Sequence, residues 1–133
     1  MKRRQFFQAI AAVGATAAAT SAAFAAGHSQ AVSSGMFEGR SNHVTSGSVS
    51  VIQEDGRYFV ELGEDFSLDG GPDPRVGFGR DGVYDPDAYL GALLSLNGKQ
   101  RYAVPITWDP AQFSEVFIWC EVASVPLGVA SLK

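Results

Sequence analysis

The sequence predicts a single all-β domain, a small antiparallel β-sandwich. Three observations lead to this fold class. Beyond residue 34, short extended runs alternate with Gly, Pro, Asn and Asp. Dipeptides typical of tight turns stand between such runs at Asp55-Gly56 and Asn97-Gly98. No segment of this part has the length and periodicity of a long helix. Many short strands with turn residues between them are typical of β-sandwiches and barrels.

The first 26 residues have the features of an export signal. The basic run "KRR" at residues 2–4 precedes an Ala-rich, weakly apolar stretch that ends in "AFAA". This order is typical of secretory signal peptides, with cleavage expected after residue 25 or 26. The run "RRQFF" resembles the twin-arginine export motif, with Lys2 where Ser or Thr is common, while a general secretory signal fits the same charges. We expect a bacterial protein exported to the periplasm or secreted, with no stable membrane span after processing.

The part that remains after cleavage is short and acidic. Cleavage after residue 25 leaves about 108 residues, the length of one domain. We expect a flexible lead-in at residues 27–34 and the sandwich at residues 35–133. The signal contains three of the ten Lys and Arg residues and none of the 14 acidic residues, so the net charge of the remainder is −7. This charge disfavours nucleic acid and anionic membranes as partners, and we predict no nucleic-acid binding.

The first predicted element is a β-hairpin. Residues 46–53 alternate, with Val49 and Val51 on one face, and residues 57–62 are rich in aromatic and β-branched side chains. Asp55-Gly56 between them is a strong hairpin signal. Residues 63–87 are rich in Gly, Pro and Asp, so we expect a loop with at most a brief strand at residues 75–78.

The C-terminal third predicts further strands and one helical turn. A short apolar run from residue 89 leads to the turn at Asn97-Gly98. The remaining predicted elements are a strand at residues 101–104 that stops at Pro105, a helical turn at residues 109–114 with Asp109 as cap and Pro110 in its first position, and two strands at residues 115–120 and 122–132 that break near Ser124 and Pro126.

The only cysteine, Cys120, directly follows Trp119 in an apolar run. In a strand, Phe117 and Trp119 face one side, whereas Val116, Ile118 and Cys120 face the other. One face should form the core, and the other should be covered or form a pocket. An unpaired thiol in an oxidising compartment needs protection or a use. The alternative is that the cysteine is a small buried hydrophobic residue.

His43 and Met36 are further candidate ligands. His43 precedes a predicted strand, where a loop could present it. Haem requires one or two axial ligands, which His43, Met36 or Cys120 could supply, and without a Cys-x-x-Cys-His motif the haem would be non-covalent. A blue-copper site needs two histidines and a cysteine, and because no histidine follows Cys120 the local cysteine–histidine–methionine run of such sites is absent. A closed zinc site needs more cysteines and histidines, and the acidic residues between 65 and 87 are more typical of turns, so we predict no metal site. The cofactor is unknown from the sequence. No nucleophile–base pair indicates an enzyme with its own substrate.

Four segments in order resemble the DM13 domain: "GMFEGRSNHVTSGSVSV", "EDFSLDGGPDPRVGF", "LNGKQRYAVP" and "FSEVFIWCEVASVPLGVASL". From the first to the last, these segments span residues 35–132. Residues 80–89 are longer and more acidic than the family's usual link. The most specific residues of the resemblance are Gly71, Pro72, Asp73, Tyr102, Pro105, Ile118, Trp119 and Cys120.

The resemblance implies a β-sandwich related to DOMON domains, which bind haem or sugars. It also implies a proposed electron-transfer role for the cysteine matched by Cys120, as a naked thiol or as a ligand of a prosthetic group. We therefore expect an exported redox module that acts with an unknown redox partner protein. His43 would be a second ligand or would stabilise the thiolate. The alternative is a non-catalytic binding module in which Cys120 is merely buried and residues 65–87 form a recognition surface.

Overall fold

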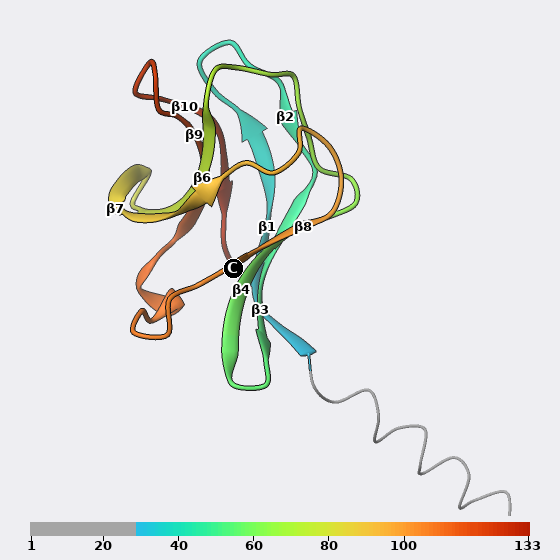
Figure 1. Cartoon of the computed structure of the whole chain (residues 1–133), viewed down its shortest axis with the longest axis vertical. Helices are drawn as coiled ribbons and strands as arrows, with labels where there is room; N and C mark the ends of the chain where they lie inside the picture. The colour runs from blue at the N-terminus through green and yellow to red at the C-terminus, as the bar shows by residue number, and fades with distance from the viewer. Residues whose placement is uncertain (1–28) are drawn as a thin grey trace, which may run out of the picture. The chain divides into compact units, whose positions relative to one another are not determined.

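The computed structural model describes residues 29–133, and within this range the chain is built from antiparallel strands without an α-helix (Figure 1). The predicted all-β sandwich is confirmed. The predicted signal peptide at residues 1–26 lies outside the described residues. The elements are β1 (Ser29–Gly39), β2 (Thr45–Ser46), β3 (Ser48–Glu54), β4 (Arg57–Leu62), β5 (Ser67–Leu68), β6 (Pro74–Arg80), β7 (Val83–Ala92), β8 (Gln100–Ala103), the 3-10 turn η1 (Pro110–Gln112), β9 (Glu115–Cys120) and β10 (Val125–Ser131).

Most strands belong to one curled sheet. Its order is β7-β6-β9-β10-β1-β3-β4-β8, while β2 and β5 form a separate two-stranded sheet. The two end strands of this order, β7 and β8, approach each other. The N–H of Leu94, just after β7, donates to the hydroxyl of Tyr102 in β8 at 2.9 Å. The same N–H lies 3.2 Å from the side-chain oxygen of Gln100. The sheet therefore nearly closes into a barrel-like sandwich.

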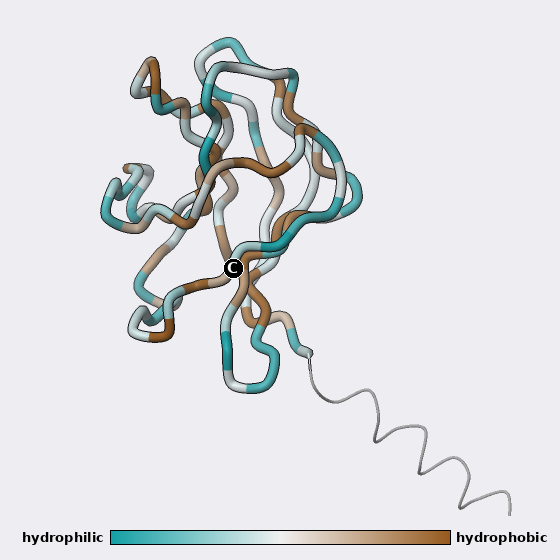
Figure 2. Tube along the Cα trace, viewed as in Figure 1, coloured by the Kyte–Doolittle hydropathy of each residue, from teal (hydrophilic) through white to brown (hydrophobic). Residues whose placement is uncertain are grey.

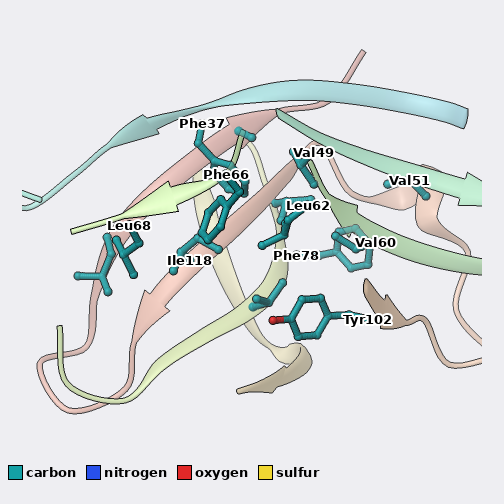
Figure 3. Packing of buried hydrophobic residues seen from close by; sticks show 14 of the residues in the cluster. Phe37, Val49, Val51, Val60, Leu62, Phe66, Leu68, Phe78, Tyr102 and Ile118 are labelled. Carbon is teal, nitrogen blue, oxygen red and sulfur yellow. The ribbon is translucent and has the colours of Figure 1, made fainter. Parts of the chain in front are cut away.

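The apolar core fills the space that the curled sheet encloses (Figure 3). Val49 and Val51 of β3 are at most 1% exposed, so these two residues share the core face, as their predicted place on one face of the strand allows. Figure 2 shows hydrophobic residues along the strands, whereas the tip of the β3–β4 hairpin is hydrophilic. Burying a large aliphatic or aromatic side chain contributes about 1.5–3 kcal/mol. Other buried core residues are Phe37, Val60, Leu62, Phe66, Leu68, Val76, Phe78, Ala88, Tyr102, Val104, Val116, Ile118, Cys120, Leu127 and Ala130.

The predicted β3–β4 hairpin is confirmed, with Glu54 opposite Arg57. Asp55 and Gly56 adopt φ of 51° and 78°. A two-residue turn of this mirror-image type matches the twist of the strands and needs positive φ at both positions, which Asp-Gly tolerates. The turn residues therefore fix the register of this hairpin.

The brief strand allowed at residues 75–78 lies within β6, but the loop expected for the rest of residues 63–87 was wrong where β7 pairs with β6 to form another hairpin. Its turn is again Asp-Gly, with Asp81 at φ 52° and Gly82 at φ 81°. β7 contains Pro86, which cannot donate a ladder hydrogen bond and is tolerated because β7 is the last strand of the sheet order. The register between β6 and β7 shifts on both sides of Gly77. Because its ladder is irregular, β7 lacks the regular alternation of apolar and polar residues by which a strand is predicted.

The remaining elements lie close to their predicted positions. β8 begins and ends one residue earlier than predicted, and β9 has the predicted bounds. The predicted helical turn is η1, whose N-cap Asp109 accepts a hydrogen bond from the N–H of Ala111 at 3.0 Å. Residues 29–34, which the sequence assigned to a lead-in, lie in β1. There Ser34 exchanges two backbone hydrogen bonds with Lys133, at 3.1 and 2.9 Å.

Candidate functional site

Cys120 is the last residue of β9, and its side chain lies in the apolar core, 2% exposed. Val116 and Ile118 share this face, as the alternation in the sequence predicts. β9 is paired on both sides, with Cys120 opposite Pro74 in β6 and Val125 in β10. The backbone of Cys120 is thus fixed by a neighbouring strand on each side. Because Cys120 is the last residue of β9, the turn at residues 121–124 follows it directly.

Two hydrogen bonds hold the thiol. Its S–H donates to the carbonyl oxygen of Pro72, with Sγ and O 3.2 Å apart. Sγ also accepts the backbone N–H of Ala123 at 3.4 Å. Pro72 lies in the loop at residues 70–73, and Ala123 lies in the turn at residues 121–124 between β9 and β10. We call these two segments the thiol cover, because both of them supply a direct partner to the sulfur.

The two segments of the thiol cover are joined to each other by a backbone hydrogen bond. The N–H of Glu121 donates to the carbonyl of Asp73 at 3.3 Å. The turn itself is closed by the N–H of Ser124, which donates to the carbonyl of Cys120 at 2.8 Å. The sulfur is therefore covered by two short irregular segments, which a few hydrogen bonds hold in place. Such segments open at a smaller free-energy cost than paired strands in a core.

The loop of the thiol cover explains the Gly-Pro-Asp motif. Gly71 has φ of 146°, a conformation that side-chain-bearing residues rarely adopt. A Cβ at this position would also lie 3.2 Å from Leu127 and 3.5 Å from His43. Pro72 supplies the carbonyl that accepts the thiol proton, and Asp73 binds the guanidinium of Arg75 at 2.8 Å. Each residue of the motif thus has a structural task at the sulfur or next to it.

His43 lies beside the same loop but is not a direct partner of Cys120. Its Nδ1 is 2.9 Å from Oδ1 of Asp69, and the other oxygen of Asp69 accepts the N–H of Val44 at 3.0 Å. The ring lies next to Gly71, which precedes the thiol's acceptor Pro72. Among the described residues no hydrogen bond joins the imidazole to the thiol. The structure therefore brings His43 to the thiol cover but not to the thiol. The loop at residues 70–73 lies next to the imidazole at Gly71 and contacts the sulfur of Cys120 through Pro72.

Two aspartates in this region are held in the charged form, and stability should depend on them at acid pH. The N–H of Ser48 and then its hydroxyl lower the pKa of Asp65 below 3.8. The N–H of Val44 and then His43 lower the pKa of Asp69 below the same value. Each carboxylate thus stabilises the fold fully above about pH 3.8, and this contribution is lost as pH falls through the lowered pKa.

The prediction is that the free energy of unfolding of an Asp65→Asn/Asp69→Asn variant declines less steeply below that pH than that of the unchanged chain. Urea unfolding measured between neutral pH and about pH 2.5 checks this expectation, because that range spans the ordinary aspartate pKa. Glu64→Gln, at an exposed position of the same loop, is the control and should keep the original decline. Identical acid profiles for the double variant and the unchanged chain would contradict the assignment.

Met36 is not brought to Cys120. It is 60% exposed on β1, whereas its neighbour Phe37 points into the core. Phe37 is in register with Ala130 of β10, and Ala130 with Val116 of β9. Val116 precedes Cys120 by four residues, about 13 Å along a strand. Met36 and the thiol therefore lie toward opposite ends of β9.

Three further residues of the resemblance are placed at structural positions. The hydroxyl of Tyr102 donates to the side-chain oxygen of Gln100 at 2.7 Å, at the point where the curled sheet nearly closes. The carbonyl of Pro105 accepts the N–H of Trp108 at 3.0 Å in the turn after β8. Trp119 lies on the outer face of β9, away from the core.

The outer face of β9 is partly covered and partly a pocket, as the alternation predicts. The rings of Trp119 and Tyr84 stack with centroids 4.3 Å apart and planes at 9°. Tyr84 also meets Phe117 edge to face at 5.7 Å. An open pocket beside them is lined by Trp119, Tyr84, Arg75 and Tyr89, among others. The sequence reasoning missed the contributions of β7 to this pocket. The Asp81-Gly82 dipeptide was the signal that could have revealed them.

The candidate ligands do not converge on one site for haem. The sulfur of Cys120 faces Pro72 and Ala123 in a close-packed core, and Nδ1 of His43 is bonded to Asp69. As arranged, these residues do not fit a haem held by Cys120. Within residues 29–133, no group of three or more His, Cys, Asp or Glu side chains is placed to hold a metal ion. The same range has no helix of the length and apolarity needed to cross a membrane.

Comparison with known families agrees with this arrangement. Residues 36–132 match the model of a family described as electron transfer DM13. The chain belongs to the DM13 family. The match includes the loop of the thiol cover, Cys120 and the outer aromatic face, and the description of the family identifies this chain as an electron-transfer module. No curated protein and no solved structure matches the chain.

Proposed function

We propose that this DM13 chain is an exported electron-transfer module whose redox-active group is the Cys120 thiol. The observation that carries the proposal is the thiol cover: the sulfur of Cys120 is held by one carbonyl and one N–H, both from short irregular segments. The family to which the chain belongs is described by electron transfer. The features of residues 1–26 support export by the twin-arginine route to the periplasm or the medium. An unpaired thiol in such a compartment is protected when it is covered.

Exchange with a disulfide is the chemistry open to a single thiol. Cys120 loses its proton, and its sulfur attacks one sulfur of a partner disulfide. A new S–S bond forms to Cys120 while the partner's S–S bond breaks, and the departing sulfur takes up a proton to become a thiol. The sulfur of Cys120 is oxidised and the departing sulfur is reduced, so atoms and electrons balance. The partner's thiol reverses the step. Attack requires the thiol cover to open, since Cys120 is 2% exposed.

A chromogenic aromatic disulfide tests the proposal on the folded chain. We expect one equivalent to react per chain, at a rate well above that of global unfolding, because opening of the thiol cover suffices. A small dithiol should restore the free thiol. Cys120→Ser should show no reaction, since the chain contains one cysteine. Reaction only at the rate of global unfolding would contradict the proposal.

The second candidate is a non-catalytic binding module with a merely buried cysteine. The observation that favours it is the place of Cys120 in the apolar core cluster. In that case Cys120→Ser would change only stability, by about 0.5–3 kcal/mol, and labelling would follow unfolding. The labelling experiment therefore separates the two candidates.

A further inference from the structure

The outer face of β9 has a pocket whose chemistry the thiol does not use. Its volume is about 310 Å³, at the lower end of the range of small-molecule sites, about 300–1,000 Å³. Besides Pro86, it is lined by three aromatic residues and three polar ones: Tyr84, Tyr89, Trp119, Arg75, Glu121 and Ser124. Trp119 forms its wall on the side of the sheet opposite Cys120, the next residue in the strand.

The aromatic walls are set in place by the glycine-rich strand β6. At Gly77 a Cβ would lie 2.8 Å from the ring of Tyr84, so only glycine lets this ring approach the strand. Tyr84 then stacks on Trp119 at 4.3 Å, while Tyr89 stays 41% exposed. Flat aromatic surfaces of this kind favour a planar ring, which stacks on them or meets them edge to face.

The charges around the pocket disfavour an ionic ligand. The guanidinium of Arg75 lies 5.1 Å from the centre of the Tyr89 ring, so the position that an aromatic surface offers to a cation is filled. Arg75 is itself paired with Asp73 through Nη2 and Nε, and Glu121 lies nearby as a second carboxylate. Two carboxylates beside one guanidinium disfavour an anion. A neutral ligand remains.

The polar groups left over define what a neutral ring should carry. Nη1 of Arg75, the carboxylate of Glu121 and the hydroxyl of Ser124 make no hydrogen bond to other described residues. Arg75 can only donate, ionised Glu121 can only accept, and Ser124 can do both. The pocket can therefore satisfy both carbonyl oxygens and hydroxyl groups on the rim of a planar ring.

We infer that this pocket binds a neutral quinone and its hydroquinone. The carbonyl oxygen of the quinone accepts from Arg75, and the hydroxyl of the hydroquinone donates to Glu121. A redox-active ring is chosen over other planar rings because the inference rests on the proposed electron-transfer function. Binding itself moves no electron and no proton. It places the ring against Trp119, on the opposite face of β9 from Cys120.

Calorimetric titration of the purified chain with duroquinone, and without oxygen with its hydroquinone, tests the inference. Every ring position of duroquinone is methylated, so a thiol cannot add to it. We expect saturable binding at one site, weakened about tenfold or more by Tyr89→Leu, since losing an aromatic partner removes stacking and apolar contact. Trp119→Leu should weaken it similarly. Tyr58→Leu, in a different pocket, is the control and should bind as the unchanged chain does.

Two polar variants test the orientation of the ring. Arg75→Gln should weaken the quinone more than the hydroquinone, and Glu121→Gln should do the reverse. Absence of saturable binding, an equal loss in Tyr58→Leu, or binding of glucose in place of duroquinone would overturn the inference. Cys120→Ser should keep full affinity for duroquinone. An inert Cys120 with intact binding would therefore overturn the proposed function alone, and a reactive Cys120 without binding would overturn the pocket alone.

Discussion

Phe78→Ala should lower the free energy of unfolding by about 3–5 kcal/mol, the cost of removing a fully buried aromatic ring and leaving a cavity. Phe78 is completely buried in the centre of the core (Figure 3). Its ring stacks on Phe113 with centroids 4.6 Å apart and planes at 5°. β6 is paired with β7 on one side and with β9 on the other, so its backbone cannot collapse into the space that the ring leaves.

The loss is large relative to the whole stability of such a domain, which is about 5–15 kcal/mol. Urea unfolding followed by tryptophan fluorescence measures it, and each kcal/mol corresponds to about 4–8 °C in Tm for a domain near this size. Ile106→Ala is the matched control, because Ile106 is 79% exposed and its removal should change stability by no more than about 0.5 kcal/mol. A loss below about 1.5 kcal/mol for Phe78→Ala would show a loosely packed core.

The local parts of the fold could be predicted because neighbouring residues determine them. Asp55-Gly56 fixes the turn between β3 and β4, and the alternation places Val49 and Val51 on one face. Asp109 and Pro110 likewise determine the 3-10 turn. In each case a few adjacent residues supply both the conformation and its hydrogen bonds.

β7 was missed because its sequence lacks clean alternation. Its ladder with β6 shifts register around Gly77, and it contains Pro86. The Asp81-Gly82 turn was present in the sequence, but the high Gly, Pro and Asp content of its surroundings favoured a loop. The aromatic pocket was lost with the strand, since Tyr84 and Tyr89 belong to β7.

Alternation predicted which residues share a face with Cys120, but it could not predict that this face is the core or which groups contact the sulfur. Pro72 lies 48 positions away in the chain, and the pairing of His43 with Asp69 spans 26 positions. Only the order of strands in the sheet brings these segments together. The sequence did contain one indication of the site, the Gly-Pro-Asp motif, whose meaning depends on the positive φ of Gly71.

Gly71→Ala should make Cys120 react with an aromatic disulfide about five- to hundred-fold faster than in the unchanged chain. Alanine is strained at φ 146°, at a cost of about 1–3 kcal/mol, and its Cβ would lie tightly against Leu127, 3.2 Å away. Loosening of this loop withdraws the carbonyl of Pro72 from the thiol. Each 1.4 kcal/mol removed from the cost of opening corresponds to a factor of ten in the open population.

Gly56→Ala provides the matched control for this experiment. Gly56 also has a positive φ, 78°, but it lies in the β3–β4 turn with nothing near its missing Cβ. Both alanines should lower stability, whereas only Gly71→Ala should accelerate labelling beyond what the loss of global stability explains. Local opening exposes little surface, so the accelerated labelling should depend weakly on urea. Equal acceleration in the two variants, or a urea dependence as steep as that of unfolding, would mean that Cys120 is reached only through the unfolded chain and that the thiol cover does not gate it.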